Sequence, residues 1–413
     1  MRRPRVLGAA VLLLLAAAPP AAADAPETLQ ARVANAAFLA QAPPPPTPGA
    51  VCVIDSGVDT DTDVAPAIVS RYANDGGPPD DVGALGDDGT TLTKHGTLVS
   101  GVIASQLDGQ GSSGIWPAAK IISIRVLSGP STDTTVSAYI AAMTRCWSRP
   151  NVKVINLSLA GLKIEPGETN LLQNAINEAR DTYSINVVAA AGNEGLPVVA
   201  YPAAFDGVLG VGATDANGMR WTSALGGSNF GTGLDISTLG QDVCVTLPAA
   251  IAPSSSLGKA SGTSFAAPVV SAVIAALRSY DPSITLDQAE TAVLSAAKTT
   301  SAGKTLDAGA AFEFAGLNYG ASLLTNLVSG YAAGPAFDCT APAVVGGGGA
   351  PGSLGTSSAG RPAATAAPAQ AVQGPPATDH IAPVDPSTTR PTVPPPPVER
   401  PRSKRTPTGV PPL

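Results

Sequence analysis

Between residues 50 and 300, short apolar runs alternate with longer segments whose apolar side chains recur at helical spacing. Such runs are typical of strands buried on both faces, and such segments are typical of helices that cover a sheet. We therefore expect strands at 51–54, 121–127, 152–159, 186–191 and 208–213. Helices are expected at 95–105, 134–147, 170–180, 264–277 and 286–296. This alternation predicts one α/β domain with a mostly parallel central sheet flanked by helices.

Changes in composition mark the limits of this domain. Residues 1–23 combine three arginines, an apolar run and a final Ala-Ala-Ala, the pattern of a secretory signal peptide. Residues 24–48 are rich in alanine and proline and are predicted to be a short linker. Residues 341–413 contain 17 prolines and few large apolar side chains, so they are predicted to form a disordered tail. The folded domain is thus expected at residues 49–340.

The charge and the motifs of the chain exclude several classes of function. Residues 24–340 hold 15 Lys and Arg against 28 Asp and Glu, which argues against a nucleic-acid partner. After the signal segment no apolar stretch is long enough to predict a membrane span. The glycines at 207–212, which accompany a predicted strand, fail the G-x-G-x-x-G register because Asp215 stands at the third glycine position. The chain contains no P-loop, H-E-x-x-H or C-x-x-C motif. A nucleotide cofactor or a histidine-rich metal centre is therefore not expected.

Three residues are candidates for nucleophilic catalysis. The chain has two histidines and His380 lies in the tail, so an imidazole base would have to be His95. Asp55 follows a predicted strand, and Ser264 begins a predicted apolar helix in a motif that differs from G-x-S-x-G at Ala266. Taken singly, each has an ordinary structural interpretation: a turn aspartate, an exposed histidine and a helix N-cap.

Four segments together resemble the signature blocks of the subtilisin-like serine proteases, the subtilase or peptidase S8 family. They are residues 53–58, 95–101, 188–195 and 262–268, and they carry Asp55, His95, Asn193 and Ser264. The resemblance implies the family's three-layer α/β fold and a serine endopeptidase that cleaves peptide bonds through an acyl-enzyme intermediate. Ser264 would be the nucleophile, His95 the general base and Asp55 the group that orients the imidazole. Asn193 would belong to the oxyanion hole.

The same resemblance places the walls of a substrate cleft. Ser158, Leu159 and Ala160 would form one wall, and Ala190 and Gly192 the other. These residues are small or apolar and carry no charge. We therefore expect an apolar or broad preference at the substrate residue before the scissile bond.

Four cysteines allow three disulfide pairings, with buried free thiols as the alternative, and export favours disulfides. In the family fold, the helix matching residues 134–147 crosses over the strand that ends in the catalytic aspartate. The resemblance thus implies a Cys52–Cys146 bond and leaves Cys244 to pair with Cys339.

The resemblance implies no cofactor for the chemistry, and the sequence identifies no metal site. Two acidic clusters could bind structural calcium, but solvated loop carboxylates are expected there instead; these clusters are Asp59, Asp61 and Asp63, and Asp80, Asp81, Asp87 and Asp88. The expected partners are protein or peptide substrates, and the expected form is a monomer secreted to the periplasm or outside the cell.

Two departures from the family pattern, Leu98 and Phe265, replace residues that carry no proton in the mechanism. The sequence leaves two other classes of function open. The domain could be a catalytically silent binding module, or the chain could be a cell-surface protein that uses its tail for interactions.

Overall fold

The computed structural model describes residues 28–85, 92–108, 111–127, 134–160, 164, 167–224, 226–248, 251, 257–317 and 339. The predicted signal peptide (1–23) and the predicted tail (341–413) lie outside these residues.

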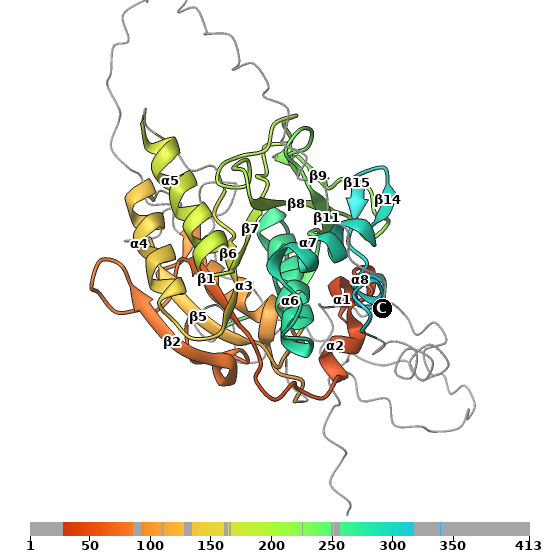
Figure 1. Ribbon diagram of the computed structural model, residues 1–413, viewed down its shortest axis with the longest axis horizontal. Helices are drawn as coiled ribbons and strands as arrows, with labels where there is room; N and C mark the ends of the chain where they lie inside the picture. Colours follow the sequence, from red (N-terminus) through yellow and green to blue (C-terminus); the bar gives the residue numbers. More distant parts are fainter. Residues whose placement is uncertain are drawn as a thin grey trace, which may run out of the picture. The chain divides into compact units, whose positions relative to one another are not determined.

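A nine-stranded sheet forms the centre of the fold (Figure 1). Its order is β14-β15-β11-β8-β7-β6-β1-β5-β2, and every neighbouring pair is parallel except the hairpin β14–β15 at one end. The strands are β1 (Ala50–Asp55), β2 (Ile68–Ala73), β5 (Lys120–Arg125), β6 (Val152–Leu157), β7 (Asn186–Ala190), β8 (Val208–Thr214), β11 (Ile236–Leu239), β14 (Lys298–Thr300) and β15 (Gly303–Thr305).

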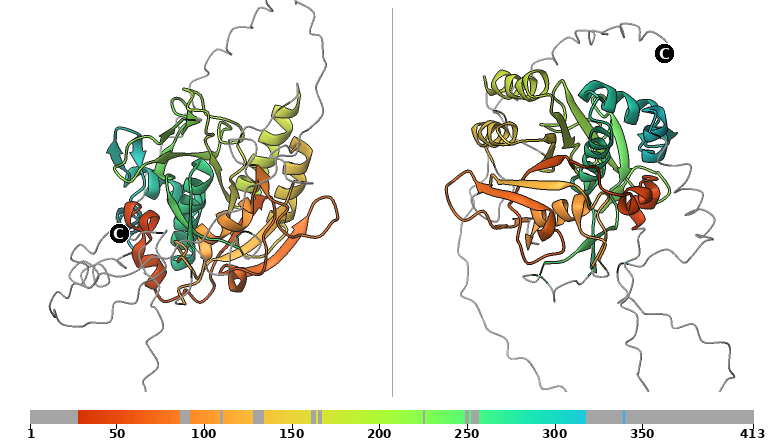
Figure 2. Two further views of the ribbon diagram at one scale, coloured as in Figure 1. Left: turned by 180° about the vertical axis from the view of Figure 1, so that it is seen from behind. Right: turned by 60° about the horizontal axis from the view of Figure 1, so that its bottom comes forward.

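Helices cover both faces of this sheet, as Figures 1 and 2 show. One face packs against α3 (His95–Ala104) and α6 (Thr263–Tyr280), and the other against α4 (Val136–Trp147) and α5 (Glu168–Asn177). The alternation of side chains along a strand produces the two cores. On β1, Val51 and Val53 enter the first core, while Cys52 and Ile54 enter the second. The structure confirms the predicted three-layer α/β fold.

The remaining elements are short. Within the described residues, three two-stranded sheets lie outside the central one: β3 (Ala84–Leu85) with β4 (Leu92–Thr93), β9 (Thr222–Ser223) with β10 (Gly226–Gly227), and β12 (Val243–Thr246) with β13 (Leu257–Ala260). A 3-10 turn, η1, spans Ala65–Ala67, and a π-helical turn, η2 (Glu178–Thr182), ends α5. The other helices are α1 (Leu29–Val33), α2 (Ala37–Gln41), α7 (Leu286–Ser295) and α8 (Ala308–Phe314).

The structure differs from the predicted linker at residues 24–48, because this stretch contains α1 and α2 and both pack on the body. Gln30 on α1 is completely buried, and its amide donates to the Cys244 carbonyl (2.9 Å) and accepts from the Cys244 N–H (3.2 Å). Phe38 on α2 meets Phe312 on α8 edge to face, with ring centroids 5.1 Å apart. Helices of five residues are too short to be stable alone. The hydrogen bonds of Gln30 to β12 and the burial of Phe38 against α8 therefore stabilise α1 and α2.

Two disulfides join distant parts of the chain. Cys52 on β1 is bonded to Cys146 on α4, and Cys244 on β12 to Cys339, with Cα–Cα distances of 5.8 and 5.7 Å. The first bond ties a central strand to the helix that crosses it. The second ties Cys339 back to β12.

One described helix, α6, is long and apolar enough to span a membrane. However, 94% of its apolar window is buried inside the fold. It is therefore the central helix of the first core.

Candidate active site

The four predicted catalytic residues lie where strands of the central sheet end and where two helices begin. Asp55 is the last residue of β1, and Asn193 follows β7 by three residues. His95 is the first residue of α3, and Ser264 is the second residue of α6. Because α3 and α6 lie side by side on one face, the carboxyl ends of the strands meet the N-termini of both helices. In open α/β sheets this edge is where ligands bind.

Asp55 and His95 form a direct hydrogen bond. The Asp55 side chain is 1% exposed, and its Oδ1 lies 2.8 Å from Nδ1 of His95. A carboxylate can only accept, so Nδ1 carries the proton of this bond and the tautomer of the imidazole is fixed. The Ser56 N–H donates to the same oxygen at 2.7 Å and holds the carboxylate in place.

Ser264 and Ser158 hydrogen-bond to each other in both directions. The Ser264 hydroxyl donates to the Ser158 carbonyl (2.7 Å), and the Ser158 hydroxyl donates to the Ser264 carbonyl (2.9 Å). Asn156 on β6 donates to the Ser158 hydroxyl at 2.9 Å. These bonds fix the start of α6 against the end of β6, and Ser264 keeps 8% of its surface exposed there.

Asn193 is oriented by the residue that precedes Ser264. Both the backbone N–H and the hydroxyl of Thr263 donate to Oδ1 of Asn193, each at 2.9 Å. Two donors on the oxygen determine which end of the amide is the NH₂ group. The side-chain oxygen is therefore used in positioning, and the NH₂ group is the end that can serve as a hydrogen-bond donor.

The predicted cleft residues lie on segments that adjoin the predicted catalytic residues. Ser158, Leu159 and Ala160 directly follow β6, and Ala190 ends β7. Gly192 has φ of +101°, and a Cβ there would collide with the Asn229 amide and lie 2.7 Å from Glu194. Sequence reasoning missed Glu194 as a neighbour of this wall. Its carboxylate accepts from the Asn229 amide at 2.6 Å, so its charge is already hydrogen-bonded.

Tyr139 on α4 contacts the backbone of the other predicted wall, at Leu159. The side chain is fully buried, and its hydroxyl donates to the Leu159 carbonyl at 2.8 Å. Burial, and then the nearby negative charge of Asp55, raise the pKa of Tyr139 above its ordinary value. The phenol thus stays protonated and keeps its donor role.

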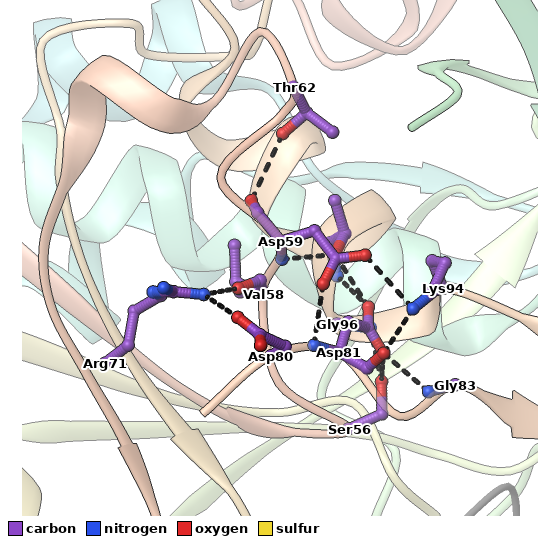
Figure 3. Close-up of polar contacts among 11 residues, drawn as sticks. Ser56, Val58, Asp59, Thr62, Arg71, Asp80, Asp81, Gly83, Lys94 and Gly96 are labelled. Atoms are coloured by element: carbon purple, nitrogen blue, oxygen red, sulfur yellow. Dashed lines mark hydrogen bonds and ion pairs between the residues drawn. The ribbon is translucent and has the colours of Figure 1, made fainter. Parts of the chain in front are cut away.

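The prediction of solvated loop carboxylates is wrong for Asp81, which is 2% exposed. The neighbouring carboxylate, Asp59, forms an ion pair with the Lys94 ammonium at 3.1 Å (Figure 3). The cation beside Asp59 is therefore a lysine. Among the described residues, no group of three or more His, Cys, Asp or Glu is placed to hold a metal ion. Asp87 and Asp88 lie outside the described residues.

The two departures from the family pattern have structural roles. Leu98 on α3 is 4% exposed and belongs to the first core. The ring of Phe265 lies against the imidazole of His95, with centroids 5.5 Å apart and planes tilted by 55°. Phe265 therefore forms an apolar side of the histidine's environment.

Comparison with known proteins agrees with this fold. The subtilase family model matches residues 49–315, and the chain belongs to this family. Among curated relatives, the M-protease of Shouchella clausii and Subtilisin Savinase of Lederbergia lenta are each 35% identical over 190 residues, or 46% of this chain. The aligned segment spans 46% of the M-protease and 64% of Subtilisin Savinase, less than two thirds of either.

Solved structures show the same relationship. A protease of Pseudoalteromonas arctica is 28% identical with a TM-score of 0.55, and the match covers 65% of this chain and 90% of that one. A structure of the subtilase cytotoxin is 25% identical with a TM-score of 0.58, covering 72% and 99% of the two chains.

Proposed function

We propose that this protein is a secreted serine endopeptidase that uses Asp55, His95 and Ser264 as its catalytic triad. The observation that carries the proposal is the 2.8 Å hydrogen bond between Asp55 Oδ1 and His95 Nδ1 at the edge where α6 presents Ser264. With Nδ1 protonated, Nε2 of His95 is the nitrogen that accepts a proton.

Acylation begins when the Ser264 hydroxyl leaves the Ser158 carbonyl and donates toward Nε2 of His95. As the oxygen attacks the peptide carbonyl carbon, His95 takes the hydroxyl proton, and Asp55 stabilises the imidazolium. The carbonyl oxygen gains negative charge, which the Asn193 NH₂ group and the Ser264 N–H at the start of α6 stabilise. His95 then gives its proton to the leaving amine, and the C–N bond breaks.

Deacylation repeats these steps with water. His95 takes a proton from the water as its oxygen attacks the acyl carbon, and the same donors stabilise the second oxyanion. The ester bond to Ser264 then breaks, the serine regains the proton from His95, and the carboxylic acid product leaves. No further co-reactant is required.

Substitution of the nucleophile tests this mechanism. Ser264→Ala should lower the turnover of an unfolded polypeptide substrate at least 10⁴-fold, on the order seen when a triad is broken. The matched control is Ser283→Ala on the exposed loop after α6, which should retain parental turnover. Circular dichroism shows whether both variants are folded. A folded Ser264→Ala protein with parental turnover would refute the mechanism, and a silent binding module would show no turnover in the parent either.

The cleft supports an apolar or broad preference at the residue before the scissile bond. Its walls carry no free charge at Ala160, Ala190 or Gly192, and the nearby Glu194 carboxylate is bonded to Asn229. A cleavage profile on a mixed peptide library should therefore favour aliphatic and aromatic residues over charged ones there. A strict requirement for Arg or Lys would show that Glu194 acts as a specificity charge instead.

A further inference from the structure

A buried carboxylate, Asp81, is hydrogen-bonded to Ser56, the residue that follows Asp55 in the chain (Figure 3). Its Oδ1 accepts from the Ser56 hydroxyl (2.7 Å) and the Gly83 N–H (2.8 Å). Its Oδ2 accepts from the N–H (2.9 Å) and the hydroxyl (2.7 Å) of Thr97. Four donors converge on one side chain that is 2% exposed. These hydrogen bonds offset part of the cost of burying the carboxylate, and burial still raises the pKa of Asp81 above its ordinary value.

The partners of Asp81 are the neighbours of the catalytic residues. Ser56 follows Asp55 in the chain, and its N–H donates to the Asp55 carboxylate. The Ser56 hydroxyl also accepts from the Gly96 N–H at 2.9 Å, and Gly96 follows His95. One hydroxyl thus joins the backbone after Asp55 to the backbone after His95.

Two glycines allow these segments to approach closely. A Cβ at Gly96 would overlap the Gly57 carbonyl and lie 3.0 Å from the Cβ of Asp55. Gly57 has φ of +109°, and a Cβ there would overlap the backbone of Asp80 and Asp81. The loop that carries Asp81 is therefore packed directly against the end of β1 and the start of α3.

A second set of contacts fixes the backbone of Asp81. Its N–H donates to Asp59 Oδ1 at 2.8 Å, and its carbonyl accepts from the Lys94 ammonium. Lys94 also pairs with Asp59 Oδ2, and it directly precedes His95. The Asp59 N–H in turn donates to the Thr97 hydroxyl at 3.0 Å. Asp81 is thus held by its backbone as well as by its side chain.

We propose that Asp81 is a positioning residue of the protease, which sets the Asp55–His95 pair by fixing Ser56 and the Gly96–Thr97 backbone. This inference rests on the proposed function, since it names a role in that catalytic machinery. Asp81 does not touch the reacting atoms. It acts through Ser56 and Thr97, and a shift of these segments changes the distance between the carboxylate and the imidazole.

The variant Asp81→Asn keeps the shape of the side chain but replaces one acceptor oxygen with an NH₂ donor. Either orientation of the amide brings that NH₂ group against a backbone N–H, of Gly83 or of Thr97. Misplacement of a catalytic group by about 1 Å can cost on the order of 10²-fold in rate. We therefore expect kcat to fall about 10- to 100-fold, with KM changed less than about threefold.

Two further variants separate positioning from charge. Ser56→Ala breaks the same bridge with no change in charge, and it should reproduce the direction of the kcat loss. Asp80→Asn removes one carboxylate at the adjacent position, which is 62% exposed and bonded to Arg71, and it should keep parental kcat. Asp59 and Lys94 contact the backbone of Asp81, Asp55 accepts from the Ser56 N–H, and His95 pairs with Asp55.

The decisive readout is the titration of the His95 imidazole, followed by NMR of the full chain in a Ser264→Ala background to prevent self-digestion. The chain has one other histidine, and His380→Ala assigns its signal. A poorly placed Asp55 stabilises the imidazolium less, so the midpoint should fall by at least about half a pH unit in Asp81→Asn and in Ser56→Ala. It should move by less than about 0.2 units in Asp80→Asn, where the lost charge is exposed.

The proposal is overturned if Asp81→Asn and Ser56→Ala, folded by circular dichroism, both titrate like Asp80→Asn. It is also overturned if only Asp81→Asn shifts, because charge alone would then explain the effect. The NMR result does not depend on turnover. A parent that hydrolyses no peptide would therefore refute the proposed function while the titration still decides the role of Asp81.

Discussion

At the scale of single residues, Thr263 determines how Asn193 faces the candidate active site. Its two donors occupy the amide oxygen of Asn193 and leave the NH₂ group as the end that serves as a donor. The same residue's hydroxyl accepts from the Gly192 N–H at 3.1 Å, so it also fixes the turn after β7. One threonine thus links the loop that carries Asn193 to the helix that carries Ser264.

Removal of the Asn193 amide should act on the transition state more than on binding. We expect Asn193→Ala to lower kcat by about 10²- to 10³-fold with little change in KM, as for other oxyanion-hole donors. Steady-state kinetics on a peptide substrate measures this, with Asn177→Ala on the exposed face of α5 as the control. An Asn193→Ala enzyme with parental kcat would exclude this residue from the oxyanion hole.

The sequence could predict Asp55, His95, Asn193 and Ser264 because each stands in a short block with a recognisable order. Asp81 could not be predicted in the same way, because an aspartate in a Gly- and Pro-rich loop has the composition of a solvated turn. Its burial depends on the hydroxyl of Ser56 and on the N–H and hydroxyl of Thr97, which lie on other segments, together with the nearby Gly83 N–H. Only the tertiary structure brings these donors together.

At the scale of secondary structure elements, α8 begins with a capped turn that also joins α1. Asp307 is the N-cap of α8, and its Oδ1 accepts from the Ala310 N–H (3.0 Å) and from the Asn35 amide after α1 (2.7 Å). Its Oδ2 pairs with Lys298 at 2.7 Å, but that lysine is 60% exposed, so solvent weakens the ion pair.

The stability of this junction should depend on pH in a defined direction. Burial alone would raise the pKa of Asp307, but the hydrogen bonds from Lys298, Ala310 and Asn35 hold it below its ordinary value of 3.8. A lowered pKa means that the stabilisation is complete above about pH 4 and is lost as the pH falls through the lowered value.

We therefore expect Asp307→Asn to lower the free energy of unfolding by about 1 kcal/mol at pH 7, and the difference from the parent to shrink below pH 4. Denaturant titrations in the Ser264→Ala background measure it. Asp61→Asn, at an exposed loop position, is the control and should differ little from the parent at either pH. A difference that stays constant or grows toward pH 3 would contradict this role of Asp307.

Strands buried on both faces could be predicted from the sequence. A half-exposed edge strand and two very short helices could not. The strands β1, β6, β7 and β8 appear in the sequence as apolar runs, and the structure has them within a few residues of the predicted limits. The edge strand β2 is half-exposed and polar along much of its length, so it has no such run. Helices α1 and α2 have five residues each and exist through contacts with β12 and α8, which no local pattern records.

At the scale of the whole molecule, two disulfides connect segments 94 and 95 residues apart. In the chain-entropy model, whose mechanism is disputed, a loop of this length is worth about 4–5 kcal/mol. Such bonds persist in oxidising compartments, and the predicted signal peptide is consistent with export to one. The fold and the N-terminal segment therefore both favour secretion.

Expression in a host that exports the protein should yield a chain that lacks residues 1–23 and contains both disulfides. N-terminal sequencing and peptide mapping without reductant measure these two properties on the same sample. This account of where the protein functions would be contradicted by a Cys52–Cys244 linkage or by free thiols. It would also be contradicted if the protein stayed in the cytoplasm with residues 1–23 still attached.

The central claim is that Ser264 is a nucleophile activated by the Asp55–His95 pair. Its most direct test is a fluorophosphonate, which phosphonylates an activated serine, followed by mass spectrometric mapping of the modified peptide. The account predicts one adduct per chain, located on Ser264, with loss of hydrolysis in proportion to labelling. Labelling should disappear in Ser264→Ala and become much slower in His95→Ala. Full labelling that leaves hydrolysis intact, or an adduct on another serine, would contradict it.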